Sequence, residues 1–157
     1  MHEPAMTFDR LVLSAQKETV RVFFKQMWDK ADKTLIPGIF HPDFTFRGSL
    51  GPVLCGCEQF ARYVDFVTGA LAEYTSDILE MVEEGNKVYA KLRYHGYQRG
   101  ELFGFPPTGR HVWWYGTPFF TFDSGKVRDL WVLGDIDGLK GQLANHKMGS
   151  ATPGMPE

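Results

Sequence analysis

The stretch Gly100-Glu-Leu-Phe-Gly-Phe-Pro-Pro-Thr-Gly-Arg110 decides how this chain folds, because it separates two long runs of alternating aromatic and polar residues. Glycine and proline end regular structure and favour turns. The stretch therefore predicts that one strand ends near Gln98 and that the next begins near His111. A further strand, Val127 to about Gly134, follows the turn Asp123-Ser-Gly-Lys126 and completes a hairpin.

Upstream of this loop, the pattern predicts helices first and strands afterwards. Apolar residues at helical spacing indicate an amphipathic helix from Thr7 to about Lys30 and a second helix from about Glu58 to Tyr74. A short strand is expected at His41–Arg47, and Ile78–Val82 is expected to pair with Val88–Gln98. This order favours an α+β fold, a cone in which N-terminal helices pack on a curved, mainly antiparallel sheet. The open mouth of such a cone is a natural ligand pocket.

Length and composition predict one domain. The 157 residues are 43% hydrophobic, enough for one substantial core, and we expect a single domain over residues 1–144 and a flexible tail over residues 145–157. Aromatic residues make up 15% of the chain, which suits either a large core or a cavity for a flat apolar ligand.

Charge and hydropathy argue against several classes of partner. The 17 Lys and Arg face 19 Asp and Glu without long blocks of one sign, so no surface for nucleic acid is expected. No apolar run approaches the roughly 20 residues that span a bilayer, and no signal peptide is recognised, so we expect a cytoplasmic protein. Cys55 and Cys57 are too close for an unstrained disulfide and lack nearby further ligands, so no metal is expected.

Asp135 is the leading candidate for chemistry, and its expected position follows from strand register. If Phe122 pairs with Val127 across the turn, Trp114 lies opposite Asp135. The same register pairs Pro118 with the residue at position 131. These pairings predict that the carboxylate lies at the end of a strip of apolar side chains.

Two roles for Asp135 follow from this position. Alternation places Trp131, Leu133 and Asp135 on one face, where apolar neighbours would raise the pKa of the carboxyl group and suit it to take a proton from a carbon acid. Alternatively, Asp135 caps a short helix from Ile136 to Leu143. Spacing alone favours the cap.

Other candidates are weaker. Gln98 is in phase with Leu92 and Tyr94, so it is expected either to donate a hydrogen bond to a substrate oxygen or to be an ordinary strand-end residue. His41 is expected either as a general base or as a partly exposed neighbour of the strand. The residues predicted to bind substrate are Trp114, Trp131, Leu133, Leu92, Tyr94, His41 and Tyr63.

The opposite face of the last two strands is also apolar. Its expected members are Trp113, Tyr115, Phe119, Leu130 and Val132. Such a face is too apolar to remain in water, so we expect a homodimer. His95 and His111 are expected on this face as well.

The motifs together resemble a known family. The loop Gly100–Arg110, Gly125-Lys-Val, Trp131-Val-Leu-Gly-Asp135 and Gln142-Leu143 resemble the SnoaL-like polyketide cyclases of the nuclear transport factor 2-like superfamily, over roughly Thr7 to Leu143. The resemblance implies an intramolecular aldol condensation that closes a ring of an aromatic polyketide methyl ester without metal or organic cofactor. It also implies that the acid matching Asp135 is the general acid/base, which favours catalysis over a cap alone.

One position departs from the family. Many members carry a histidine where this chain has Gln98, within Gly96-Tyr-Gln-Arg-Gly100. Glutamine donates hydrogen bonds but does not transfer a proton near neutral pH. Three hypotheses therefore stay open: a cofactor-independent enzyme acting on a flat carbonyl compound, a small-molecule binding module without catalysis, and a dimerisation module.

Overall fold

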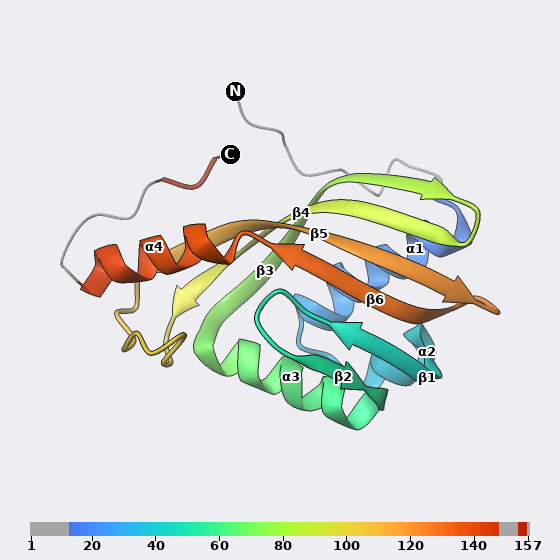
Figure 1. The fold of residues 1–157 in the computed structure, drawn as a ribbon, viewed down its shortest axis with the longest axis horizontal. Coiled ribbons are helices and arrows are strands. Elements are labelled where there is room, and N and C mark those ends of the chain that lie inside the picture. Colours follow the sequence, from blue (N-terminus) through green and yellow to red (C-terminus); the bar gives the residue numbers. More distant parts are fainter. Residues whose placement is uncertain (1–12, 148–153, 157) are drawn as a thin grey trace.

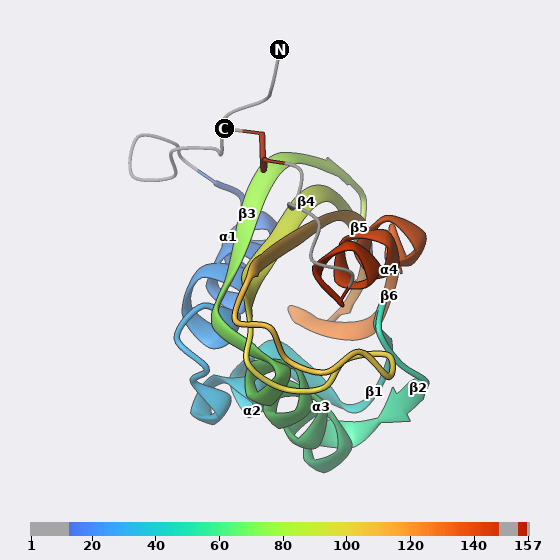
Figure 2. The ribbon, with the colours of Figure 1, turned by 90° about the vertical axis from the view of Figure 1, so that its left-hand side faces the viewer.

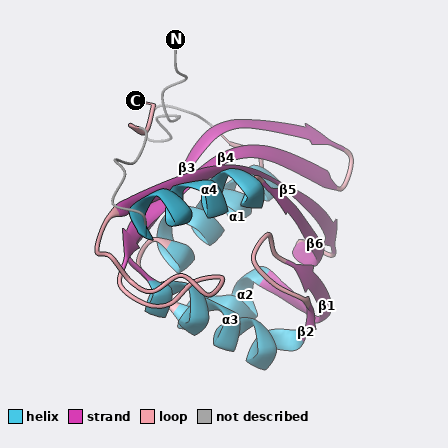
Figure 3. Cartoon of the chain, turned by 60° about the vertical axis from the view of Figure 1, so that its left-hand side comes forward, coloured by secondary structure: helices cyan, strands magenta, loops and turns pink. Residues whose placement is uncertain are grey.

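The computed structural model describes residues 13–147 and 154–156, and these residues form the expected α+β fold (Figures 1 and 3). The start of the first expected helix, residues 7–12, lies outside the described residues, as does most of the expected tail. The elements after the first helix are η3 (Lys33–Leu35), α2 (Ile36–Ile39), β1 (Phe40–Arg47), β2 (Val53–Cys55), α3 (Gly56–Ala70), β3 (Leu71–Glu84), β4 (Lys87–Gln98), β5 (His111–Asp123), β6 (Lys126–Gly134) and α4 (Ile136–Lys147).

The first helix is amphipathic and has two parts. α1 (Ala15–Val22) begins after Ser14, whose Oγ accepts a hydrogen bond from the backbone N of Lys17 at 3.1 Å. This cap satisfies a backbone donor of the first turn and sets the start of the helix. The helix continues as the π-helical turn η2 (Phe23–Trp28), whose apolar side chains are buried.

The sheet has six strands in the order β2-β1-β6-β5-β4-β3. β1 and β6 are parallel, and the other neighbours are antiparallel. Although β1 and β3 lie far apart in this order, α3 packs against both (Figure 2). The sheet is therefore curved around the helices, as expected for a cone.

The boundary between α3 and β3 differs from the prediction. The helix ends at Ala70, before the expected Tyr74, and β3 begins at once because Leu71 pairs with Gln98 of β4. Glu73 adopts a positive φ of 54° at an irregularity in the pairing. A bulge of this kind lets the strand bend while its pairing continues.

The hairpin of β5 and β6 has the expected turn, with positive φ at Ser124 and Gly125, and the expected pair Phe122–Val127. The next pair is Thr121–Asp129, so one extra residue of β6 bulges out at Arg128. Because side chains alternate, this single residue reverses the faces of the rest of β6. The predicted pairs of Trp114 with Asp135 and of Pro118 with Trp131 are therefore wrong: Gly116 pairs with Gly134, and Pro118 with Val132.

The core between the sheet and the helices is strongly aromatic. The ring of Phe23 lies 5.6 Å from the rings of both Phe40 and Phe120, and 6.0 Å from the ring of Phe60. These four side chains are fully buried and come from two helices and two strands distant in sequence. The packing fixes η2 and α3 on the inner face of the sheet, which is the wall of the site described below.

Candidate functional site

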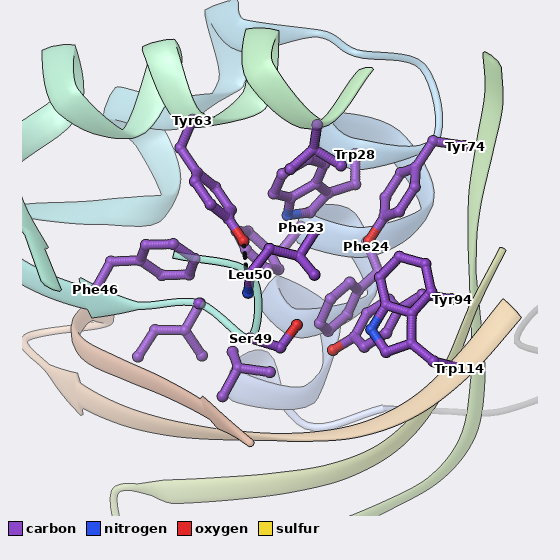
Figure 4. Close-up of a pocket in the computed structure, with 14 residues that line it drawn as sticks. Phe23, Phe24, Trp28, Phe46, Ser49, Leu50, Tyr63, Tyr74, Tyr94 and Trp114 are labelled. Atoms are coloured by element: carbon purple, nitrogen blue, oxygen red, sulfur yellow. Dashed lines mark hydrogen bonds between the residues drawn. The ribbon is translucent and has the colours of Figure 1, made fainter. Parts of the chain in front are cut away.

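A small aromatic cavity lies between the inner face of the sheet and the helices (Figure 4). Its volume is about 30 Å³, which is room for one or two water molecules. We call it the aromatic cavity. Its lining residues are Phe23, Phe24, Trp28, Phe46, Gly48, Ser49, Leu50, Tyr63, Val67, Tyr74, Tyr94, Trp114, Leu130 and Val132.

The indole of Trp114 supplies an unused hydrogen-bond donor in this cavity. Trp114 is 2% exposed, and its Nε1 has no hydrogen-bond partner among the described residues. In Figure 4 this nitrogen points toward the interior of the cavity. A buried donor without a partner is unfavourable, and such a donor is a feature of sites that bind a ligand acceptor.

Three tyrosine hydroxyl groups also line the cavity. Burial raises the pKa of Tyr63 to about 12. Burial also raises the pKa of Tyr74 and of Tyr94 well above the ordinary value for tyrosine. The three hydroxyl groups therefore keep their protons at physiological pH and remain able to donate hydrogen bonds.

Ring packing holds these side chains in place. The ring of Tyr94 lies 5.3 Å from that of Trp114 and stacks on that of Tyr74 at 6.3 Å with an angle of 12°. Across the sheet, a Cβ at Gly116 would stand 2.5 Å from Tyr94 Cε2, so glycine is needed there to make room for the ring. The walls of the cavity are thus preformed by contacts between β4, β5 and β3.

Three of the predicted substrate-binding residues line the aromatic cavity: Trp114, Tyr94 and Tyr63. Leu92 is fully buried in the core but does not line it. Trp131 and Leu133 lie on the outer face of the sheet, 41% and 53% exposed. The bulge in β6 explains this difference, because it turns both side chains outward.

Asp135 is exposed, so the expectation that apolar neighbours bury it is wrong. Its Oδ1 accepts a hydrogen bond from Gly138 N at 2.9 Å, and its carbonyl oxygen accepts one from Leu139 N at 3.2 Å. Asp135 therefore caps α4, as the alternative interpretation had it. It borders a shallow surface depression with Leu133 and Tyr115, on the opposite side of the sheet from the aromatic cavity. Its catalytic role remains a prediction.

Gln98 is fully buried but lies outside the aromatic cavity. Its Nε2 donates hydrogen bonds to the carbonyl oxygens of Gly100 at 3.2 Å and Phe105 at 3.0 Å. Its backbone also bonds to Gly109 and Arg110. Both hydrogens of the Gln98 side-chain amide thus bind the loop Gly100–Arg110. In this arrangement neither is left to bind a substrate oxygen.

His41 also lies away from the aromatic cavity. Its Nδ1 accepts a hydrogen bond from Asp43 N at 3.1 Å and lies 2.9 Å from Arg128 Nη1. These contacts match the interpretation of His41 as a partly exposed neighbour of its strand.

Most of the lining was not predicted as a site. Leu130 and Val132 were assigned to the outer face, since no sequence signal marks the bulge that turns them inward. Phe23, Phe24 and Trp28 fall in the predicted helix from Thr7 to about Lys30, where their spacing indicates only an apolar face. The segment Gly48–Pro52 carries no periodic pattern that marks a site, although its two glycines are a signal for close packing: a Cβ at Gly48 would stand 2.6 Å from Tyr63 Oη.

A second cluster of titratable groups lies on the outer face. Asp77 accepts hydrogen bonds from Arg93 Nη2 at 2.9 Å and from His95 Nε2 at 3.2 Å. His95 Nδ1 lies 3.0 Å from His111 Nε2. Burial of Asp77 opposes its ionisation, but the bonds from His95 and Arg93 outweigh burial and lower the pKa of the carboxyl group to about 2. The cluster ties β3, β4 and β5 together.

Residues 13–147 and 154–156 lack the features of a metal site and of a membrane-spanning helix. No three His, Cys, Asp or Glu side chains within this part of the chain gather closely enough to hold a metal ion. Its helices include none that is long and apolar enough to cross a bilayer.

Comparison with known proteins identifies relatives of this fold. The sequence pattern described as SnoaL-like polyketide cyclase matches residues 18–143. A search of the curated proteins finds no match.

Several solved structures share the fold. TsrD from Streptomyces laurentii is 22% identical, with a TM-score of 0.74 over 85% of this chain and 98% of that one. A candidate polyketide cyclase from Acidithiobacillus ferrooxidans is 21% identical, with a TM-score of 0.76 over 86% and 98%. AclR from Streptomyces galilaeus, a candidate hydroxylase, is 18% identical, with a TM-score of 0.72 over 83% and 96%. Proteins of this fold thus carry different activity names, and at these identities the similarity extends to the fold alone.

Proposed function

The chain belongs to the SnoaL-like polyketide cyclase family, with the nuclear transport factor 2-like fold, and from this premise we propose that it binds a flat, uncharged carbonyl compound whose oxygen enters the aromatic cavity, which has to widen to admit the rings. The observation that carries this proposal is the buried Nε1 of Trp114, a donor without a partner among the described residues. A carbonyl oxygen is the acceptor that would satisfy it.

The rest of the cavity supports the same class of ligand. Aromatic side chains favour flat apolar rings, which they can stack against or meet edge to face. The buried hydroxyl groups of Tyr74 and Tyr94, with their raised pKa values, are protonated donors that suit an acceptor. Taking a full charge into such surroundings is strongly unfavourable, so the ligand is expected to be neutral in the cavity.

The donors also bear on reactivity. Hydrogen bonds to a carbonyl oxygen polarise it and stabilise negative charge that develops there. Abstraction of a proton from carbon needs a base within hydrogen-bond reach. Among the described residues that line the cavity, the side chains are aromatic, aliphatic or hydroxyl-bearing, with neither carboxylate nor imidazole. This composition favours binding of the carbonyl compound as the function.

Ring closure by an aldol-type reaction, with Asp135 as general acid/base, is the second candidate. The match of the family pattern over residues 18–143 favours it. It requires a substrate to meet Asp135 at the depression that includes Leu133 and Tyr115. Asp135→Asn would then keep ligand affinity and lose turnover, whereas the binding proposal expects unchanged affinity in the variant and no turnover by either protein.

The binding proposal is tested with two matched compounds, 9-fluorenone and fluorene, which share a flat ring system but differ in the carbonyl group. Calorimetric titration should show tighter binding of fluorenone to the wild type. Trp114→Phe should weaken fluorenone binding about fivefold more than fluorene binding, since one hydrogen bond is lost. Trp131→Phe, the same change at an exposed position, should leave both affinities unchanged.

Two results would overturn the proposal. One is the absence of binding heat for both compounds. The other is an equal loss of affinity for fluorenone and fluorene in Trp114→Phe, because the indole would then act only through its apolar area.

A further inference from the structure

An apolar groove lies outside the aromatic cavity, between α3 and the segment that joins β1 to β2. Its volume is about 480 Å³. It is lined by Leu50, Gly51, Pro52, Leu54, Gln59, Arg62, Tyr63 and Phe66. The groove therefore has the size of a small-molecule site, within the range of about 300–1,000 Å³, while the cavity behind it does not.

Leu50 and Tyr63 line both the groove and the aromatic cavity. They are therefore the wall between the two spaces. Leu50 comes from the segment Gly48–Pro52, which is outside the regular strands, and Tyr63 comes from α3. The segment reaches toward the end of β6 (Figure 3), where a Cβ at Gly134 would stand 2.5 Å from Ser49 Cβ.

Among the described residues, one side-chain hydrogen bond joins this segment to α3. The backbone N of Leu50 donates to Tyr63 Oη at 3.3 Å, the dashed line in Figure 4. This distance lies beyond the usual range for N–H···O bonds, so the bond is weak. Gly48 and Gly51 pack closely on Tyr63, since a Cβ at Gly51 would stand 3.2 Å from its Cε1. The segment therefore packs closely against Tyr63, but hydrogen bonding contributes little to holding the two together.

We infer that Gly48–Pro52 is a lid over the aromatic cavity and that the bond between Leu50 N and Tyr63 Oη is its latch. When the lid opens, the groove and the cavity become one site large enough for a flat ligand. The released Tyr63 hydroxyl then faces that ligand as a further donor. This inference rests on the proposed function, because the lid matters only if a ligand enters.

The test measures hydrogen exchange by NMR without any ligand, so it does not depend on the binding experiment. Tyr63→Phe removes the latch and keeps the ring. Loss of this weak hydrogen bond should raise the open population about twofold to threefold. The Leu50 amide would exchange faster simply because it loses its acceptor, so the informative signal is the Nε1–H of Trp114 inside the cavity. Exchange of this indole should accelerate by the same factor.

Two comparisons sharpen the result. Leu50→Ala shortens the side chain that closes the cavity and should accelerate exchange of the Trp114 indole as well. Tyr89→Phe removes a hydroxyl group at an exposed position on β4 and should leave exchange of the Trp114 indole unchanged. Backbone amides of β5 in the same spectra report global unfolding, which must stay constant. Unchanged indole exchange in both lid variants would overturn the lid, whereas absent fluorenone binding would overturn only the proposed function.

Discussion

Asp77 retains its charge in a half-buried position because it accepts hydrogen bonds from a cation, Arg93, and from His95. Arg93 and His95 both donate to its Oδ2, and Arg93 also donates to the carbonyl oxygen of Pro156. The side chain of Arg93 is only 7% exposed, so the loss of Asp77 would leave a buried charge without its ionic partner. One carboxylate thus neutralises a buried cation and orients a histidine at the same time.

This arrangement predicts a loss of stability in acid. The folded pKa of Asp77, about 2, lies below its ordinary value of 3.8, so the folded state binds the proton less readily than the unfolded chain. The contribution of Asp77 is complete above pH 3.8 and is lost as pH falls through about 2. Urea denaturation measures the free energy of unfolding at pH 5 and at pH 2. Between these pH values the wild type should lose about 1–2 kcal/mol more of this free energy than Asp77→Asn. Equal losses would contradict the assignment.

At the scale of elements, the junction of β6 with α4 depends on Asp135. Its backbone N donates to Tyr115 O at 2.9 Å and continues the sheet pairing, while its side chain begins the helix. Glycine at position 138 leaves room for the capping carboxylate, because a Cβ there would stand 2.4 Å from Asp135 Oδ2. The helix then reaches β5 beyond the end of β6, where Gln142 bonds to the backbone N and O of Trp113.

The cap predicts a graded response to substitution. Asp135→Ala removes the acceptor for Gly138 N and should lower the free energy of unfolding by about 1 kcal/mol. Asp135→Asn keeps an acceptor oxygen and should cost less than half as much. Chemical denaturation of both variants measures the difference. Identical losses in the two variants would show that the cap does not carry the effect.

The hairpin of β5 and β6 shows what a sequence can and cannot predict. The turn at Ser124-Gly125 and the first pair were predictable, because glycine and alternation have direct backbone causes. The bulge at Arg128 was not, since any residue can occupy that position and the surrounding packing selects it. This one bulged residue explains why the wrong face of the sheet was predicted for Trp131, Leu133, Leu130 and Val132. Helix and strand existence was therefore predictable, whereas the residues of the cavity depended on a register that only packing determines.

At the scale of the whole molecule, the cone was predicted from the order of helices and strands, and the family resemblance was confirmed. The small size of the aromatic cavity was not predictable, because the segment Gly48–Pro52 carries no periodic pattern. The outer face of the sheet remains apolar, although its membership differs from the expectation. Tyr89, Phe119, Trp131 and Leu133 form this outer patch, in which the ring of Phe119 lies 4.3 Å from that of Tyr89 and 5.5 Å from that of Trp131.

We propose that the outer patch joins two copies of the chain as a homodimer. Large exposed side chains on a sheet face favour association, and a two-fold dimer is the commonest form. Sedimentation at micromolar concentration should show a dimer for the wild type and a monomer for Leu133→Glu. Val53→Glu adds the same charge at a 65% exposed position on β2 and should remain dimeric. A monomeric wild type would contradict the proposal.

The buried tyrosines of the cavity have a consequence for any weakly acidic ligand. Their own ionisation is suppressed by the surroundings, and a bound phenol or enol would meet the same surroundings. The cavity would therefore bind the protonated form of such a compound and exclude its anion. Uptake of an acidic compound would therefore decline with rising pH according to the acidity of the compound, even where the protein itself is unchanged.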